Sequence, residues 1–497
     1  MRTAFEPVIG LEIHVQLATG TKIFCGCSTD YIGAVPNVNV CPVCLGLPGA
    51  LPVLNARAVE LGILAGLALS CRIRPVSLFH RKNYFYPDLP KGYQISQYTE
   101  PLAEEGYLDV PDGGGEIRRV RIFRLHLEED AGKLVHVTED GRLEGASCSL
   151  VDCNRAGVPL AEIVSAPDIT SPAMAREYVL ALRRLVRHLG VSDGDMEAGS
   201  LRVDANISLK KPDGSWGDRV EIKNLNSLRA LERSLEYEIV RQGELLDRGG
   251  TVVQETRHWN ETTERTLGTR SKEDAHDYRY FPDPDLPPLV VTEGFVEACR
   301  RRLPELPDAR RKRFVASFGL SEEDAATLVE DRGVAAYFDA TVAAGAPPRR
   351  AAAWVRTEVL RVLREERMAV GAFPVLPEML AALLQHVERG ELSTTVARDC
   401  FEMLRTETLS LEEVLRRGVG VGKLSGEEME ALGRRVLEEN SDVVAEILGG
   451  KDVKGKKMKY LEGLMMRAIR GQGTPDAVRG TLSALLRMRE APESPTN

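Results

Sequence analysis

Polar side chains that could bind a metal or move a proton alternate with apolar residues in three stretches of the sequence. They are Glu12, His14 and Gln16 in 8–17, Arg202, Asp204, Asn206 and Ser208 in 202–209, and Arg219, Glu221 and Lys223 in 219–223. Because successive side chains of a strand point to opposite faces, each stretch predicts a strand with one apolar and one polar face. An ordinary solvent-facing sheet has the same pattern in any single strand. Three such strands together indicate a concave polar site.

Further carboxylates suited to a hard cation occur in two places. Glu128, Glu129 and Asp130 are adjacent at the end of an alternating stretch, and Glu162 lies within an otherwise apolar run. Neighbouring like charges raise one another's pKa unless a cation neutralises them, and a lone buried carboxylate needs a partner. Such oxygen ligands suit Mg²⁺ together with a bound phosphate. A surface turn would tolerate the triplet equally well, so the spacing leaves both interpretations open.

Two pairs of cysteines give the most specific local signal. Cys25 and Cys27 are followed, after thirteen residues, by Cys41 and Cys44. Four thiolates at this spacing predict a tetrahedral structural zinc site, and two pairs of buried thiols are the alternative. Since a four-sulfur site has no open position for water, we expect it to clamp a loop rather than to react.

Two segments, 81–98 and 278–285, combine aromatic rings with cations and amides. Base stacking and phosphate contact would use such residues, and so would a packed aromatic loop. Neither segment decides between these interpretations by itself.

A basic cluster lies near the C-terminus. Residues 451–470 hold seven basic and two acidic residues in a chain whose net charge is −9. The cluster follows a Gly-Gly pair and predicts a local contact with nucleic acid. Its candidate contacts are Lys454, Lys456, Lys457 and Lys459. A solvated helix face is the alternative.

The overall composition excludes several classes of protein. Hydrophobic residues make up 43% and charged residues 28% of the 497 residues, which disfavours wholesale disorder and fibrous proteins. With 65 basic and 74 acidic residues, the chain cannot coat nucleic acid through bulk charge. Glu6 and Glu12 interrupt the N-terminal apolar stretch, and the longest apolar run, 61–71, is far shorter than the ~20 residues of a membrane helix. We therefore expect a soluble cytoplasmic protein with no membrane segment.

The periodicity changes along the chain and predicts an α+β fold followed by helices. Residues 1–292 contain short alternating runs separated by turn residues, which predict a domain built on a largely antiparallel sheet with helices. Residues 293–407 have apolar residues three and four apart, as in a helical domain, and 408–488 predict a second helical domain. Residues 489–497 hold two prolines and no large apolar residue, which predicts a disordered tail.

Six motifs together resemble those of a known family. They are VIGLEIH at 8–14, RKNYFYPD at 81–88, LHLEEDAGK at 125–133, VDCNR at 151–155, MEAGSLRVDAN at 196–206 and DYRYFP at 277–282. In this order they resemble the signatures of the B subunit of the aspartyl/glutamyl-tRNA amidotransferases. Residues 408–488 resemble that family's tail domain, so the resemblance covers nearly the whole chain.

The resemblance implies a catalytic cradle in 1–292 and a tail domain that grips tRNA. It implies a ligase in which ATP and Mg²⁺ phosphorylate the side-chain carboxylate of Asp or Glu esterified to tRNA. Ammonia then displaces phosphate and leaves Asn-tRNA(Asn) or Gln-tRNA(Gln). The implied partners are the mischarged tRNA, a glutaminase (amidase) that forms the A subunit, and a small protein that forms the C subunit. The non-discriminating aminoacyl-tRNA synthetase is a further expected partner.

The resemblance also implies a metal site. The family's Mg²⁺ pattern carries onto His14, Glu129 and Glu162, with Glu12 and Asp204 nearby. Strict alternation along the preceding strand places Glu129 on the core side, so the strand must end or bulge just before it for this assignment to hold. The four-cysteine zinc site occurs in only some members of the family, and all four ligands are present here.

The remaining roles implied by the resemblance concern phosphate, nucleotide and tRNA. Lys82, in the Arg-Lys-Asn motif, would neutralise phosphate charge and complete the catalytic set with the residues named for the metal site. The expected contacts with nucleotide or the tRNA 3′ end are Asn154, Arg202 and Asn206. The four tail lysines would contact the tRNA.

Two other classes of function are weighed against this one. A non-catalytic, zinc-containing tRNA-binding scaffold would explain the cysteines, the aromatic segments and the basic tail. It leaves the clustered carboxylates without a purpose, because they repel RNA phosphate. A metal-dependent hydrolase would use His14 with the carboxylates, but it would not need the basic tail.

Overall fold

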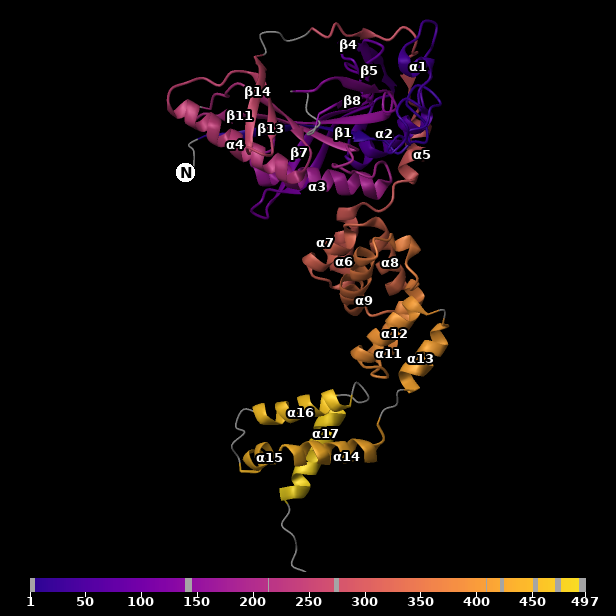
Figure 1. Ribbon diagram of the computed structural model, residues 1–497, viewed down its shortest axis with the longest axis vertical. Coiled ribbons are helices and arrows are strands. Elements are labelled where there is room, and N and C mark those ends of the chain that lie inside the picture. Colours follow the sequence, from indigo (N-terminus) through magenta and orange to yellow (C-terminus); the bar gives the residue numbers. More distant parts are fainter. Residues whose placement is uncertain are drawn as a thin grey trace, which may run out of the picture. The chain divides into compact units, whose positions relative to one another are not determined.

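The computed structural model describes residues 5–138, 145–212, 214–271, 277–407, 409–420, 424–449, 455–469 and 475–490. The chain divides into two compact units, Met1–Pro307 and Asp308–Asn497. The first contains a large sheet with helices, and the second is helical (Figure 1). The expected α+β fold with helical C-terminal regions is thereby confirmed. In the ranges given above, no helix is both long and apolar enough to span a membrane.

A twelve-stranded sheet is the framework of the first unit. The strands follow the order β14-β13-β12-β11-β1-β10-β7-β5-β4-β15, and β6 and β2 extend the sheet from β7. Their bounds are β1 Glu6–Gln16, β2 Arg72–Ile73, β4 Phe79–Asn83, β5 Tyr93–Gln97, β6 Ala103–Pro111, β7 Ile117–Glu129, β10 Pro159–Ser165, β11 Leu201–Lys210, β12 Val220–Leu225, β13 Glu255–Asn260, β14 Arg265–Ser271 and β15 Phe281–Pro282. Among the strand pairs of the described residues, only β12 and β13 are parallel, so the sheet is largely antiparallel as predicted.

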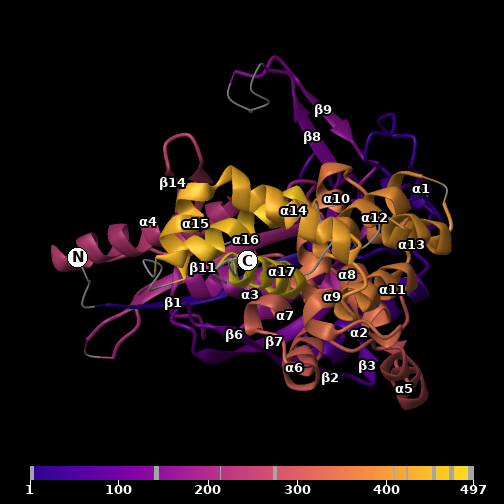
Figure 2. The ribbon, with the colours of Figure 1, turned by 90° about the horizontal axis from the view of Figure 1, so that it is seen from below.

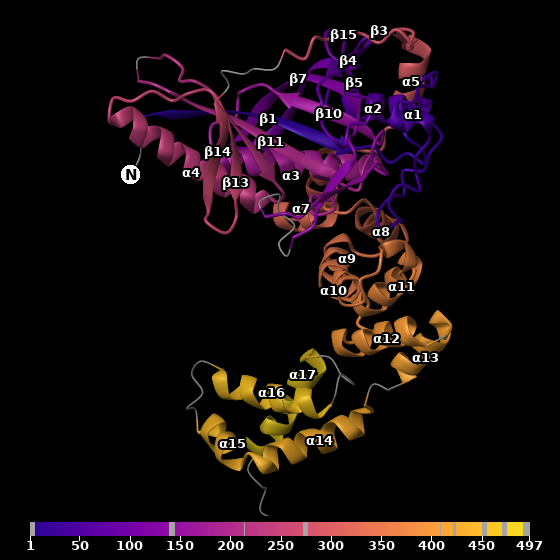
Figure 3. The ribbon, with the colours of Figure 1, turned by 45° about the horizontal axis from the view of Figure 1, so that its top comes forward.

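Helices α3 (Pro172–Leu189) and α4 (Leu228–Asp247) pack against each other and along one face of this sheet (Figure 3). The apolar residues of β1 at positions 9, 11, 13 and 15 are no more than 1% exposed and share one core with these helices. Both helices begin at a serine, Ser171 and Ser227, whose hydroxyl oxygen accepts from a backbone N–H three residues later. Because the apolar side chains fill this face, the alternate residues of the strands point to the opposite, polar face.

The rest of the first unit borders the sheet. A loop with the four cysteines and the short helix α1 (Pro42–Leu45) leads from β1 to α2 (Ala56–Ala68), which contacts β7 and α5 (Glu293–Arg301). Two smaller pairs are β3 with β16 and β8 with β9, the latter drawn apart from the large sheet in Figure 2. Their bounds are β3 Val76–Ser77, β16 Leu289–Val290, β8 Lys133–His136 and β9 Ser149–Asp152.

The second unit is built from helices around two separate hydrophobic clusters. The first cluster involves α6 Pro307–Phe318, α7 Glu322–Val329, α8 Arg332–Ala343, α9 Pro348–Trp354, the π-helical turn Val355–Val359, α10 Leu360–Glu365, the 3₁₀ turn Val370–Ala372, α11 Pro377–Glu388, α12 Thr394–Thr406 and α13 Leu411–Gly420. The second involves α14 Gly426–Glu439, α15 Ser441–Leu448, α16 Lys456–Ala468 and α17 Pro475–Glu490. The first two residues of the expected disordered tail, 489 and 490, belong to α17, and 491–497 lie outside the described residues.

Candidate active site

Strand pairing brings polar residues from distant parts of the sequence together on the polar face of the sheet. His14 of β1 lies opposite Glu162 of β10, which lies opposite His126 of β7. On the other side of β1, His14 lies opposite Arg202 of β11. Residues directly opposite one another in neighbouring strands share a face, so these four side chains form a row across the sheet. Glu128, two positions beyond His126, points to the same face.

Three of these side chains form a cluster that could hold a metal ion. His14 Nε2 lies 3.4 Å from Glu128 Oε1 and 3.5 Å from Glu162 Oε2. One potential ligand atom from each residue lies within 4.8 Å of the other two. Both glutamates are buried, and Ser96 Oγ donates to Glu128 Oε2 at 3.2 Å. One imidazole nitrogen and two carboxylates form a donor set that fits Mg²⁺. Further oxygen ligands, such as those of a phosphate, would fill its remaining coordination positions.

The electrostatics of this cluster show that it requires positive charge. His126 Nε2 lies 3.0 Å from Glu162 Oε2 and 3.7 Å from Glu128 Oε2. Burial alone would lower the pKa of His126, but the two carboxylates raise it to about 9. Burial would likewise raise the pKa of Glu162, but His126 and His14 hold it well below its usual value. The two histidines therefore balance the carboxylates when no cation is bound, and a divalent ion could take over that role from a proton.

The expected third metal ligand, Glu129, lies elsewhere. Strand β7 continues through Glu128 to Glu129, so it does not end before Glu129. The register shift in its pairing with β10 lies opposite Val164 and Ser165, not at the Glu129 end. Glu129 therefore points to the core side, as strict alternation requires. Its carboxylate forms an ion pair with buried Lys91 and accepts from the backbone N–H of Ile95 at 2.8 Å. The structure thus brings Glu128, not Glu129, to His14 and Glu162.

Asp130 is a residue whose importance the sequence motif did not reveal. Its carboxylate is buried and accepts hydrogen bonds from Arg202 Nη2 at 2.6 Å and from Gln16 Nε2 at 3.0 Å. Arg155 Nε lies 3.6 Å away. Burial would raise the pKa of Asp130, but Arg202 and Arg155 hold it below its usual value. Asp130 therefore fixes Arg202 at the edge of the cluster, and the only sequence signal for it was membership of the acidic triplet.

Glu12 and Asp204 lie opposite each other in β1 and β11, two positions along the strand from His14. Glu12 Oε1 accepts from Asn206 Nδ2 at 2.9 Å, and Asp204 Oδ2 accepts from Lys223 Nζ at 2.9 Å. These residues share the polar face with the cluster of His14, but they do not belong to its closely spaced set of ligand atoms. They extend the polar face toward β12.

Lys82 reaches the polar face from the opposite direction. It lies opposite Gln94 of β5. Two positions along β4, on the same face, His80 lies opposite Ser96, whose hydroxyl donates to Glu128. Its ammonium lies 5.0 Å from the centre of the Tyr278 ring. Burial would lower the pKa of Lys82, but the carboxylates of Glu128 and Glu162 contribute to raising it above its usual value. Lys82 is therefore a cation near the two carboxylates.

Asn154 is placed differently from the expected nucleotide contact. It is fully buried, and both ends of its amide bind the cysteine loop. The oxygen accepts from the N–H of Asn39 at 2.8 Å, and the nitrogen donates to the carbonyl of Val35 at 2.8 Å. This placement supports a role in holding the loop rather than in contacting a nucleotide.

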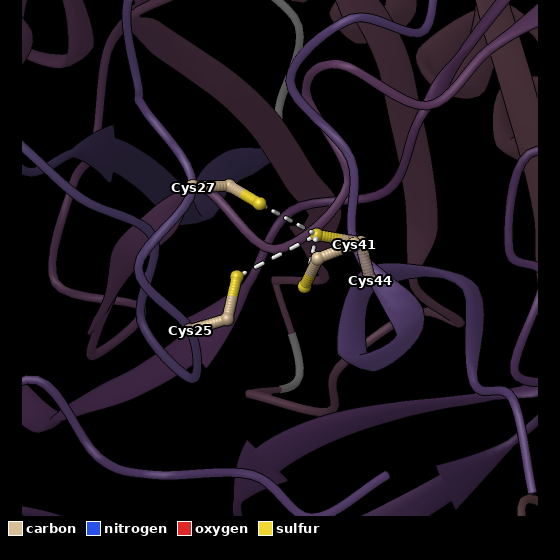
Figure 4. Close-up of side chains that lie close together, drawn as sticks. All are labelled: Cys25, Cys27, Cys41 and Cys44. Carbon is tan, nitrogen blue, oxygen red and sulfur yellow. Dashed lines mark hydrogen bonds between the residues drawn. The ribbon is translucent and has the colours of Figure 1, made fainter.

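The four cysteines lie together, and their side chains point toward one another (Figure 4). Cys44 Sγ lies 3.5 Å from Cys25 Sγ, 3.7 Å from Cys41 Sγ and 3.8 Å from Cys27 Sγ. These distances exclude disulfide bonds but match the edges of about 3.8 Å in a tetrahedron with Zn–S bonds of about 2.3 Å. The geometry therefore fits a four-thiolate zinc ion.

A buried lysine completes the surroundings of the cysteine cluster. Lys22 is fully buried, and its Nζ donates to Cys44 Sγ at 3.4 Å and to the carbonyl of Asn39 at 2.7 Å. A buried ammonium needs negative charge nearby, and thiolates on a metal provide it. A hydrogen bond from Cys25, with a further contribution from Lys22, lowers the pKa of Cys44 to about 4.

The described tail lysines lie in the first turn of α16. Lys456 and Lys459 are exposed, whereas Lys457 forms an ion pair with Glu446. Lys454 lies outside the described residues. Cations at a helix N-terminus oppose the helix dipole and lower its stability, so this placement favours a functional reason for the lysines.

Two family models match the chain. The GatB/GatE catalytic domain matches residues 7–297, and the GatB domain matches residues 336–486. Among curated proteins, the chain is 47% identical to the B subunit of the aspartyl/glutamyl-tRNA(Asn/Gln) amidotransferase of Carboxydothermus hydrogenoformans, over 96% of this chain and 98% of the relative. It is 48% identical to the protein of that name from Geobacter sulfurreducens and 49% identical to the one from Thermomicrobium roseum, over 97% of this chain and 99% of each relative.

Proposed function

Since the chain belongs to the family of B subunits of the aspartyl/glutamyl-tRNA(Asn/Gln) amidotransferases, we propose that the polar face of its sheet activates the amino acid carried by a mischarged tRNA. The complex is a glutamine-hydrolysing ligase that forms a carbon–nitrogen bond. In this chain's share of the reaction, the side-chain carboxylate of Asp or Glu on the tRNA is phosphorylated by ATP, and ammonia then displaces the phosphate.

The order of these steps follows from leaving-group chemistry. A carboxylate cannot expel oxide when ammonia attacks, whereas an acyl phosphate expels a stabilised phosphate dianion. Phosphoryl transfer requires the protein mainly to position reactants and neutralise charge. The polar face could both position the reactants and neutralise their charge, because it combines a potential metal site, Lys82 and Arg202 on one surface.

The observation that carries the proposal is the close grouping of His14, Glu128 and Glu162. These three residues would hold Mg²⁺, and the ion, when bound, would neutralise negative charge on the phosphates. Glu128 replaces Glu129 in this assignment because its carboxylate is the one beside His14. Lys82 would contact the transferred phosphate, and Arg202, held by Asp130, would bind a further anionic group of the substrates.

Glu12, Asp204 and Asn206 would complete the substrate surface. Glu12 and Asn206 are hydrogen-bonded to each other, and Asp204 is bonded to Lys223, so each side chain is held in a fixed position. In this arrangement they can orient the nucleotide or the incoming ammonia without binding the metal directly. Asn154 keeps a structural role in the cysteine loop, whose four thiolates would bind a structural zinc ion.

The chain works within a complex that contains the other amidotransferase subunits. We propose that the amidase of the complex, its A subunit, releases ammonia from glutamine and that the small C subunit ties the two larger chains together. The substrates would be Asp-tRNA(Asn) and Glu-tRNA(Gln), made by a non-discriminating synthetase in the cytoplasm. Residues 1–292 would be the catalytic part, 293–407 a connecting helical part, and 408–488 the part that grips tRNA.

The test is glutamine-dependent amidation of each mischarged tRNA by the reconstituted heterotrimer, with ADP release followed in parallel. We expect ADP release to require both Mg²⁺ and the mischarged tRNA. His14→Ala should remove ADP release and amidation while tRNA still binds. A heterotrimer that amidates normally with His14→Ala would contradict the assigned role of this cluster and favour the alternative of a non-catalytic tRNA-binding scaffold.

A further inference from the structure

A row of tyrosines borders the candidate active site at the β15–β4–β5 edge of the sheet. The rings of Tyr98 and Tyr280 are stacked, with centroids 4.1 Å apart and planes 4° apart. Tyr278 contacts Tyr280 edge to face at 6.1 Å, and Tyr84 contacts Tyr278 in the same way at 6.0 Å. Tyr86 continues the row from Tyr84 at 6.2 Å. We call these five residues the tyrosine row.

Much of the aromatic surface here faces solvent. Tyr86 is 59% exposed and Tyr98 is 42% exposed. Phe85, next to the row in sequence, is 80% exposed, and its ring lies against Gly92, where a Cβ atom would come within 3.1 Å of it. Large aromatic side chains grouped in this way on a soluble protein usually mark a binding surface. A loop whose rings served only to pack would bury them.

The row is held in place by several polar contacts. Asn83 donates from its backbone N–H and from its side chain to the carbonyl of Tyr278, at 3.0 and 3.1 Å. Arg81 binds the carboxylates of Asp283 and Asp285, each at 2.8 Å, and so ties the segment after Tyr280 to β4. The rings are therefore presented in a fixed arrangement before any ligand binds.

The row lies close to the reacting groups. Tyr98 follows Ser96 by two residues, about 7 Å along an extended chain, and Ser96 Oγ bonds Glu128. Lys82 lies over two rings of the row, 5.0 Å from the centre of Tyr278 and 5.7 Å from the centre of Tyr84. A base stacked on the row would therefore lie near Lys82 and on the Ser96 side of the Glu128 carboxylate.

We propose that the tyrosine row, with Phe85, is the stacking platform for the single-stranded 3′ end of the tRNA, and that it takes the base of the terminal adenosine. The inference rests on the proposed function, because the amino acid to be phosphorylated is esterified to that nucleotide. The base must consequently lie beside the site that binds the side-chain carboxylate. Exposed Arg279, between two tyrosines of the row, is placed to bind a backbone phosphate.

The adenine of ATP has the same aromatic chemistry, but the extent of the row favours the tRNA end. One adenine can cover one or two rings, whereas four rings here, those of Tyr86, Tyr98, Tyr278 and Phe85, are each at least 39% exposed. Successive bases of a single strand stack on successive aromatic side chains, each typically contributing enough to change affinity about tenfold. The platform thus matches several unpaired nucleotides better than one nucleotide.

The experiment compares two tRNA transcripts, one complete and one lacking only the terminal adenosine, for binding to the heterotrimer. Amidation by the wild-type heterotrimer is measured first, because its absence would count against the proposed function itself. In the wild type, removal of the terminal adenosine should weaken binding about tenfold. In the double variant Tyr98→Leu and Tyr280→Leu, the complete tRNA should bind about tenfold more weakly, and the two transcripts should bind equally.

Phe85→Leu provides a second variant that does not disturb the stacked pair, since the Phe85 ring is largely exposed. We expect it to weaken binding of the complete tRNA several-fold. Phe123→Leu is the matched control, because Phe123 is 55% exposed but lies outside the row, and it should leave binding unchanged. Wild-type discrimination between the two transcripts in the tyrosine variants, or a rise confined to the KM for ATP, would overturn the proposal.

Discussion

Glu128 and Glu129 are neighbours in one strand, yet their carboxylates serve opposite faces of the sheet. Glu128 Oε1 lies 3.4 Å from His14 Nε2 on the polar face, whereas Glu129 forms an ion pair with Lys91 on the core side. The two residues are chemically identical, so replacing each in turn by Gln distinguishes an effect on activity from an effect on stability. This pair gives the most direct test of the metal assignment.

We expect Glu128→Gln to lower tRNA-dependent ADP release roughly 100-fold or more, because it removes a carboxylate that would hold Mg²⁺ beside the reacting phosphates. Thermal unfolding should change less than for Glu129→Gln, since the amide has the same shape and the lost ion pairs with His14 and His126 are offset in part by relief of repulsion with Glu162. Glu129→Gln should instead destabilise the protein by about 3–5 kcal/mol, because Lys91 then stays buried without a counter-charge. Glu128→Gln with full turnover, beside an inactive but stable Glu129→Gln, would contradict the assignment.

The Glu238 network should determine part of the acid stability of the first unit. Glu238 is fully buried, receives a bidentate pair of hydrogen bonds from Arg241 at 2.9 and 2.8 Å, and lies 3.2 Å from Arg257. Burial would raise its pKa, but the bonds from Arg241 and Thr266 hold it below its usual value. Its contribution to stability is therefore complete well above the usual glutamate pKa of about 4.3 and is lost as the pH falls through the lowered pKa.

Glu238→Gln tests this relationship in urea unfolding followed between pH 3 and 7. We expect the variant to be less stable than the wild type near neutral pH, by about 3–5 kcal/mol. The difference should shrink as the pH falls below 4.5, because the wild type loses the carboxylate's contribution there. A difference that stayed constant with pH would show that packing, and not charge, explains the effect.

Loss of one cysteine should remove the metal from the loop. For Cys41→Ser we expect the zinc content, measured by elemental analysis, to fall from about one ion per chain to well below that. The unfolding temperature should fall with it, because the loop then lacks its cross-link and Lys22 loses charged partners. Cys148→Ser is the control, since Cys148 is exposed and lies outside the four-cysteine cluster. Equal zinc content in the two variants would contradict the assignment of the four cysteines as zinc ligands.

Two exposed lysines of α16 should contribute to tRNA affinity mainly through charge. Replacing Lys456 and Lys459 by Gln removes two cations, so the slope of log affinity against log salt should become shallower by roughly 1.4–1.8. Lys457→Gln should have a smaller effect, because Lys457 is already paired with Glu446. Binding titrations at several salt concentrations measure the slope, and an unchanged slope in the double variant would exclude these lysines from the tRNA contact.

The sequence predicted the fold class and most of the polar face because both follow from local periodicity. Alternation in 8–17 and 202–209 fixes which side chains share a face, whatever the neighbours of each strand are. The cysteine cluster could also be predicted from the sequence, because its four thiols lie at short spacings within one connecting loop. The same alternation pointed Glu129 to the core, and the structure places it there.

Other parts of the site depend on which strands become neighbours, and no local pattern encodes that. Glu128 meets His14 only because β10 separates β7 from β1, and Asp130 meets Arg202 across a sequence distance of 72 residues. The same holds for Asn154, whose motif suggested a ligand contact but whose amide is bonded to the cysteine loop. Such contacts require the sheet order and the loop path.

The sequence by itself determined that the chain folds as a sheet domain followed by helices, that one sheet face is polar and that four cysteines are close together. Only the tertiary structure decided which glutamate joins His14, which cations balance the carboxylates and how the tyrosines from two distant segments form one surface. The physical reason is that periodicity acts between residues a few positions apart, whereas a site of opposed charges and stacked rings forms between strands whose pairing is set by the packing of the whole core.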